Sequence, residues 1–173
     1  MRNLIVEGMK SLETTLPALD ASYRDWSQFA RRFGELLARF HRLETERANG
    51  IHNQIVALQQ MIDERLLAWV KQHYADLPSL PAVKGPVMVH HVPHYLARCR
   101  NTGEVRVALL VFDGLSVDQW VHIREHLTKY APALSYDEST TFAWPPTLTS
   151  VSRQALFSGL RPREFEGSIE HTS

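Results

Sequence analysis

The apolar residues of the first 77 positions recur at steps of three and four, as on one face of a helix. In the segment 23–48 they are Trp26, Phe29, Phe33, Leu36, Phe40 and Leu43. The turn residues "ANG" at 48–50 interrupt the pattern, and it resumes at Ile51 and continues to Trp69. We predict two long helices joined by a turn at 48–50 and packed antiparallel as a hairpin, with a shorter helix ahead that ends near Pro17.

Residues 81–104 differ from the helical region in their proline content. Pro78, Pro81, Pro86 and Pro93 lie in or beside this segment. Because proline lacks a backbone donor and disfavours helix at the residue before it, the segment is predicted to be a linker with short extended pieces. The expected domains are therefore a helical hairpin region at 1–80, a linker at 81–104 and a second domain at 105–173.

The second domain is expected to be α/β. The run "VRVALLVF" at 105–112 is typical of a buried parallel strand, and "LSYDESTTFAW" at 134–144 indicates a second, less apolar strand. Helical periodicity favours a helix at 117–130 capped by Ser116, and another from about Thr149 that ends at "GLRP". The fold class predicted is an N-terminal helical hairpin followed by the opening β-α-β-α part of an α/β domain.

Composition excludes some classes of protein. The 173 residues are 44% hydrophobic, which is enough for a packed core. The chain has 19 basic and 19 acidic residues, so its net charge gives no indication of nucleic acid or membrane as a partner. No apolar run approaches 18 residues and the first residues lack the pattern of a signal peptide, which predicts a cytoplasmic protein without membrane contact.

Arginines of the first long helix admit two interpretations. They could contact nucleic acid, or they could form a solvated, salt-bridged face with the acidic residues between them, and the sequence favours the second. The arginines are Arg31, Arg32, Arg39, Arg42 and Arg47.

Candidate chemistry gathers where the two predicted strands end. Asp113 follows the first strand, and Thr147, Thr149 and Ser150 follow the second. Parallel strands would bring these groups to one edge of the sheet, beside a helix N-terminus that suits a phosphate. Each residue also has a plainer role open to it: Asp113 in a turn, Thr149 as an N-cap, and Arg153 as a surface arginine.

Three histidines, His90, His91 and His94, form the cluster "HHVPH". They could hold a metal ion, but Pro93 argues against a regular helix at this point, so exposed loop histidines are expected instead.

Two motifs carry a resemblance to a known family. "VALLVFDGLSVDQW" at 107–120, followed by "PPTLTSVSRQALFSGLRP" at 145–162, resembles the start of the PglZ family. That family belongs to the alkaline phosphatase superfamily and occurs in BREX phage-defence systems. The second motif is also similar to the nucleophile segment of nucleotide pyrophosphatase/phosphodiesterases, in which a Pro-Thr pair precedes the nucleophilic threonine by two residues and a Gly-x-x-Pro closes the helix.

The resemblance assigns roles to three residues. It implies that Thr149 is the catalytic nucleophile, which would form a phospho-threonine intermediate. It implies that Asp113 and Thr149 are metal ligands. The implied cofactors are divalent metal ions, zinc in particular, and a complete site of the superfamily holds two of them. Arg153, one helical turn beyond Thr149, is our candidate for phosphate binding.

The superfamily takes its remaining metal ligands from segments further along the chain. We therefore expect residues 105–173 to be the truncated start of an alkaline-phosphatase-like domain, inactive by itself; His171 is too close to the nucleophile to be one of the later ligands. Other phage-defence proteins are the expected partners, and nucleic acid is a candidate substrate. The alternative is a non-catalytic helical interaction module with a degenerate α/β remnant.

Overall fold

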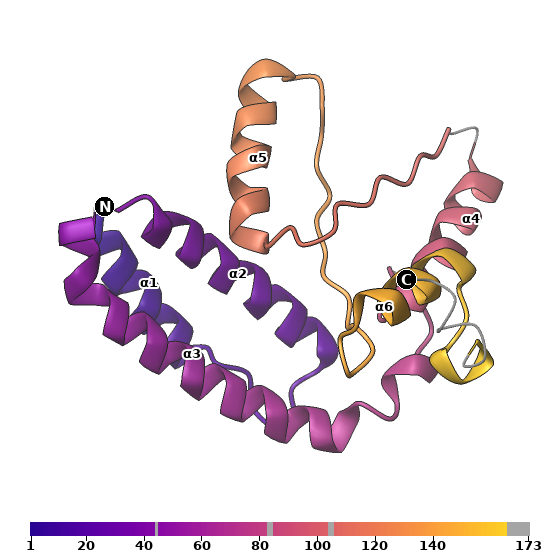
Figure 1. The fold of residues 1–173 in the computed structure, drawn as a ribbon, viewed down its shortest axis with the longest axis horizontal. Coiled ribbons are helices and arrows are strands. Elements are labelled where there is room, and N and C mark those ends of the chain that lie inside the picture. The colour runs from indigo at the N-terminus through magenta and orange to yellow at the C-terminus, as the bar shows by residue number, and fades with distance from the viewer. Residues whose placement is uncertain (44, 83–84, 104–105, 166–173) are drawn as a thin grey trace. The chain divides into compact units, whose positions relative to one another are not determined.

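The computed structural model describes residues 1–43, 45–82, 85–103 and 106–165, without the side chains of 45–49. The described residues form six α-helices and three short 3-10 helices (Figure 1). They divide into two units, and each is described by itself. The first unit comprises Met1–His73 and Phe112–Thr140, and the second comprises Tyr74–Val111 and Thr141–Ser173.

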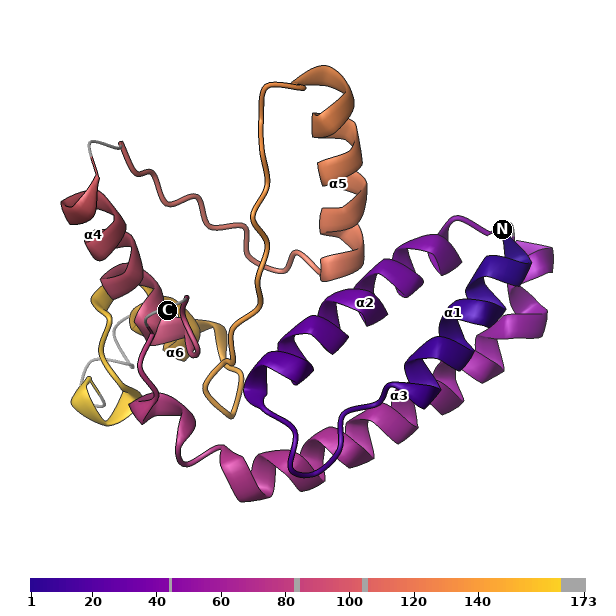
Figure 2. The same cartoon turned by 180° about the vertical axis from the view of Figure 1, so that it is seen from behind.

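The first unit contains four helices, which are α1 (Arg2–Thr14), α2 (Tyr23–His41), α3 (Thr45–His73) and α5 (Val117–Tyr130). Helix α1 packs against both α2 and α3, and it lies alongside α3 in both Figure 1 and Figure 2. The apolar stripes read from the sequence supply the core of this unit. Its fully or nearly fully buried side chains include Ile5, Leu12, Trp26, Phe29, Leu36, Ile51, Ile55, Leu58 and Trp69.

Ring contacts at both ends show that α2 and α3 run antiparallel. Near the start of α2, Trp26 lies 6.1 Å from Trp69 near the end of α3. At the other end, Phe40 lies 6.2 Å from His52. The predicted hairpin is confirmed, but the predicted turn at 48–50 is wrong, because α3 already begins at Thr45. A single helical glycine costs only about 1 kcal/mol, so the long apolar stripe of α3 outweighs it.

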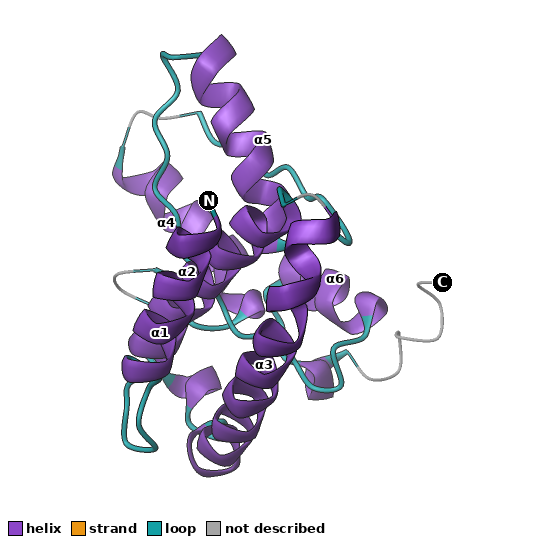
Figure 3. Ribbon diagram, turned by 90° about the vertical axis from the view of Figure 1, so that its left-hand side faces the viewer, coloured by secondary structure: helices purple, strands orange, loops and turns teal. Residues whose placement is uncertain are grey.

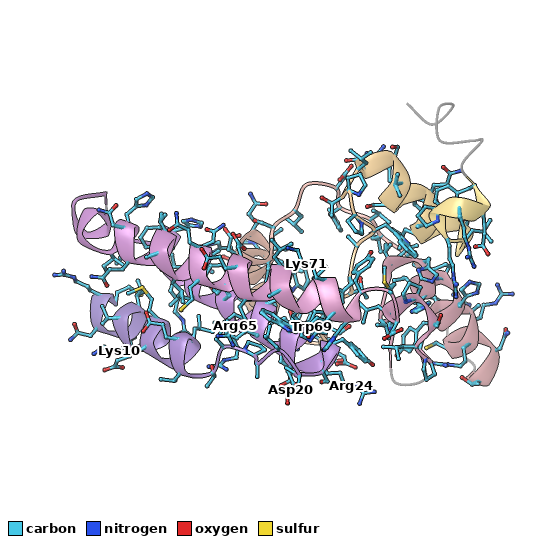
Figure 4. All side chains as sticks on the ribbon, turned by 90° about the horizontal axis from the view of Figure 1, so that it is seen from below. Lys10, Asp20, Arg24, Arg65, Trp69 and Lys71 are labelled. Carbon is cyan, nitrogen blue, oxygen red and sulfur yellow. The ribbon has the colours of Figure 1, made fainter. Side chains whose placement is uncertain are left out.

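Trp69 also connects α3 to the segment before α2. Its Nε1–H donates to the carbonyl of Ala21 at 2.7 Å. Figure 4 shows Trp69 close to the part of the chain that carries Asp20 and Arg24. A buried indole needs such an acceptor, and here the acceptor fixes the loop that enters α2.

Arginines of α2 and its C-cap are paired, but their acidic partners come from elsewhere in the chain, whereas the sequence-based interpretation places them between the arginines. Arg31 pairs with Glu138 and Arg42 with Glu125. Arg32 donates to the hydroxyl of Thr15 at 3.0 Å. The side chain of Arg47 lies outside the described residues.

Helix α5 packs against α2 through a close approach at Gly34. The predicted start of α5 at Ser116 is confirmed, and the N–H of Ser116 donates to Gln119 Oε1 at 3.1 Å. A Cβ atom at Gly34 would come within 2.7 Å of Val117 Cβ. Only glycine leaves room for α5 at this point.

We expect Gly34→Ala to lower the free energy of unfolding by about 2 kcal/mol, because the added methyl group overpacks the α2–α5 contact. Urea unfolding followed by circular dichroism measures the change. Gly50→Ala is the matched control: the added Cβ would meet only the end of the Arg2 side chain at 3.3 Å. Equal effects of the two substitutions would contradict this account of the contact.

The second unit contains short elements, which are η1 (Leu77–Ser79), η2 (Val89–His91), α4 (Val92–Thr102), α6 (Thr149–Ser158) and η3 (Pro162–Glu164). Helices α4 and α6 and the turn η2 pack against one another. The segment predicted as an extended linker thus contains a helix. Pro93 lies in the first turn of α4, where its missing N–H would have no intrahelical partner in any case.

The predicted strands are absent from the described residues, so the α/β fold class with a β-α-β-α part is wrong for them. Figure 3 shows helices and loops there and no strand. Residues 106–112 are exposed, with Leu110 at 72% and Phe112 at 69%. In the second segment only Phe142 pairs, through an isolated parallel bridge to Met88. A buried parallel strand requires partners on both sides, and neither segment has them here.

Candidate functional site

Thr149 is the first residue of α6, as the motif predicts. The N-cap position is taken by Leu148, whose side chain cannot accept a hydrogen bond. The N–H of Ser152 donates to the carbonyl of Leu148 at 2.9 Å, and the N–H groups before it have no acceptor within the helix. The interpretation of Thr149 as an N-cap is therefore wrong, and its exposed hydroxyl lies beside free helical donors.

The packing of α6 turns Thr149 and Arg153 away from the core. Val151 and Ala155 are buried and form a cluster with Phe165, against which Val89 and Trp144 pack. Thr149 and Arg153 each precede one of these two buried residues by two positions, which is roughly 200° around a helix. Both are exposed, and their spacing of one turn places them on the same face.

The end of α6 is fixed by Gly159, at the predicted "GLRP" stop. Gly159 has φ of 71°, a left-handed conformation that favours glycine. Nε2–H of His94 donates to the Gly159 carbonyl at 3.0 Å. A Cβ atom at this position would come within 3.0 Å of the His94 ring at Cε1. The glycine of the motif therefore both ends the helix and seats it against α4.

Asp113 lies in a turn with Gly114, which has φ of 71°. The turn interpretation of this Asp-Gly pair is confirmed, and it does not exclude a chemical role for the exposed carboxylate. Asp113 belongs to the first unit, whereas Thr147, Thr149 and Arg153 belong to the second. Within one unit the structure thus brings together the nucleophile candidate and the phosphate-binding candidate, and it assigns the candidate metal ligand Asp113 to the other.

The expectation of exposed loop histidines is wrong for His90 and His91, which lie in η2 and are not exposed, whereas His94 is exposed but lies on α4. His90 is only 4% exposed, and its ring lies 4.1 Å from that of His91 and 5.2 Å from that of Trp144. His91 Nδ1 accepts from the N–H of Met88 at 3.2 Å, and its Nε2–H donates to the Pro78 carbonyl at 3.3 Å. These bonds fix His91 as the neutral tautomer with the proton on Nε2. Pro93 was interpreted as evidence against a helix, but proline is compatible with the first turn of a helix, which is where Pro93 lies in α4.

The environment of His90 and His91 favours their uncharged forms. Burial, and after it the neighbouring His91 and Arg161, lower the pKa of His90 to about 4. Burial also lowers the pKa of His91, although its bond to the Pro78 carbonyl acts in the opposite direction. Trp144, which precedes the nucleophile segment, therefore packs against the uncharged ring of His90.

We expect the second unit to lose stability in acid through His90. Its pKa is about 4 when folded against 6.5 when exposed, so below pH 6.5 the unfolded chain binds a proton that the folded chain excludes. Above pH 6.5 His90 is neutral in both states and the second unit has its full stability. As the pH falls from 6.5 to about 4, protonation of the unfolded chain lowers the free energy of unfolding. The loss amounts to about 3 kcal/mol. Unfolding free energies measured across this range should fall in the wild type and stay flatter in His90→Phe, whereas His126→Phe, at an exposed position of α5, should retain the wild-type slope.

The comparison with protein families bears on this site. Residues 93–171 match the family described as the BREX system PglZ alkaline phosphatase-like domain. This part of the chain is PglZ-like. Searches of curated proteins and of solved structures found no match. The PglZ match confirms the resemblance predicted from the two motifs, and its range includes Asp113, Thr149 and Arg153.

Alkaline phosphatase-like families such as PglZ generally use divalent metals. Asp113 and Thr149 offer oxygen donors that suit such ions. Within residues 1–43, 45–82, 85–103 and 106–165, however, no group of three or more His, Cys, Asp or Glu side chains could hold a metal ion. The two candidate ligands, Asp113 and Thr149, belong to different units. His171 lies outside the described residues.

Among the described helices, none combines the length and the apolar character needed to cross a bilayer.

Proposed function

We propose that the protein containing this chain is a PglZ-type hydrolase of phosphoric esters, with Thr149 as its nucleophile. The observation that carries the proposal is the placement of Thr149. The threonine singled out by the motif is the exposed first residue of a helix whose N-cap is a leucine. Free N–H groups and the positive end of the helix dipole suit a phosphate at this position.

The proposed reaction has two displacement steps. Thr149 Oγ1 attacks phosphorus and forms a new P–O bond, while the bond from phosphorus to the ester oxygen breaks and the leaving alcohol takes up a proton. Water then attacks the phosphothreonine, which releases the phosphate product and returns the proton to Oγ1. Arg153, one turn further on the same exposed face, is proposed to bind a non-bridging phosphate oxygen in both steps.

A threonine hydroxyl is a weak nucleophile at neutral pH and requires activation. A divalent metal, zinc in particular, is the proposed cofactor, and Asp113 and Thr149 are the donors that this chain offers it. Phosphate monoesters and diesters are both candidates, with nucleic acid among the diesters and other phage-defence proteins as partners.

Trapping the intermediate tests the proposed function. The full-length protein is mixed with a phosphate ester, quenched in acid and digested, and phosphothreonine is located by peptide mass spectrometry. We expect the modification at Thr149 and at neither Thr147 nor Ser150. Modification of another residue, or turnover with no phosphorylated peptide at any quench time, would contradict the assignment.

A further inference from the structure

The second unit has a pocket beside the segment that leads to Thr149. Its volume is about 400 Å³, and we call it the Trp144 pocket after one of its walls. The residues that matter for its chemistry are Tyr74, Trp144, Pro145, Arg161 and Arg163. This volume lies in the range of pockets that hold small molecules.

The aromatic wall of the pocket is held rigidly. The rings of Tyr74 and Trp144 meet edge to face, with centroids 6.3 Å apart. Tyr74 O–H donates to the carbonyl of Ala143 at 2.6 Å, and burial raises the pKa of Tyr74 to about 12, so the phenol stays protonated. Trp144 also packs against His90, with ring centroids 5.2 Å apart. A fixed ring of this kind can stack on a planar ligand with little loss of conformational entropy.

The polar side of the pocket is cationic. Arg161 and Arg163 line it, and none of the described residues that line it is acidic. Arg161 donates from Nη2 to the Pro78 carbonyl at 3.0 Å, which orients its guanidinium, while its backbone N–H is bound by Glu164. Two guanidinium groups, with no carboxylate among the described lining residues, favour an anion, and their planar donors match the oxygens of a phosphate.

We propose that the Trp144 pocket binds a nucleotide, with the base stacked on Trp144 and the phosphate paired with Arg161 and Arg163. The inference rests on the proposed function for the presence of a phosphate ester, and it gives the nucleotide a binding subsite of its own, since neither Thr149 nor Arg153 lines the pocket. Because Trp144 and Pro145 belong to the segment that leads to Thr149, a nucleotide held here lies on the part of the chain that positions the nucleophile.

Calorimetric titration of the full-length protein with adenosine monophosphate tests this proposal. We expect adenosine and inorganic phosphate each to bind at least about tenfold more weakly than the nucleotide, because each lacks one of the two contacts. Arg163→Ala should weaken nucleotide binding about tenfold. Arg100→Ala, at an exposed position of α4 in the same unit, should leave binding unchanged.

The results that would contradict the pocket assignment differ from those that would contradict the proposed function. Absence of nucleotide binding, equal binding of adenosine, or equal effects of Arg163→Ala and Arg100→Ala would each overturn the pocket assignment. Thr149→Ala should still bind the nucleotide, since Thr149 does not line the pocket. Nucleotide binding without any phosphothreonine would support the pocket assignment and contradict the proposed nucleophile. Phosphothreonine at Thr149 without nucleotide binding would support the nucleophile and contradict the pocket assignment.

Discussion

Thr149→Ala is expected to lower the rate of phosphoric ester hydrolysis by the full-length protein at least about a thousandfold, as the loss of a covalent nucleophile does in other enzymes. The physical reason is that alanine keeps the helix and its free N–H groups but has no oxygen that can bond to phosphorus. The residual rate would reflect binding and orientation alone. Initial rates with a chromogenic phosphate ester, measured with saturating divalent metal, give the comparison.

Thr147→Ala is the matched control for this substitution. Thr147 has the same side chain, is also exposed, and lies two residues earlier in the same segment. It should therefore retain activity within a few-fold of the wild type. A Thr149→Ala variant with wild-type turnover would remove the nucleophile assignment, and a comparable loss in Thr147→Ala would show that the segment, not the hydroxyl, is what matters.

Glu138→Ala is expected to reduce the free energy of unfolding of the first unit by about 2 kcal/mol, because it leaves the half-buried Trp120 Nε1–H without its acceptor and removes one of the carboxylate partners of Arg124. The Glu138 carboxylate, 17% exposed, accepts from Trp120 Nε1–H and from Arg124. Arg31 donates to the carbonyl of the same residue at 2.6 Å. Arg31 lies on α2, whereas Trp120 and Arg124 lie on α5, so this one residue joins the two helices.

Asp137→Ala provides the control for Glu138→Ala, since it removes a neighbouring but exposed carboxylate. It should change the unfolding free energy by less than about 0.5 kcal/mol. Glu138→Gln, which keeps a side-chain acceptor for Trp120 but loses the charge, should fall between the two. Urea unfolding followed by circular dichroism measures all three, and a neutral Glu138→Ala would contradict the network.

The sequence predicted the helices well because their signals are local. Periodicity and capping depend on residues within a few positions of one another, and this is why the starts of α5 and α6 fell where Ser116 and Thr149 indicated. The two strands failed for the opposite reason. An apolar run such as 105–112 indicates a segment that is typically buried. It forms a β-strand only where neighbouring strands supply its backbone hydrogen bonds.

The same division applies to the candidate site. The sequence by itself determined that Thr149 begins a helix, that Arg153 follows on the same face, and that Gly159 ends the helix, because spacing and glycine geometry decide these points. Only the tertiary structure decided that Val151 and Ala155 turn the site outward, that His90 is buried under Trp144, and that two arginines line a pocket beside it. These features depend on packing between segments far apart in the chain, which local patterns do not specify.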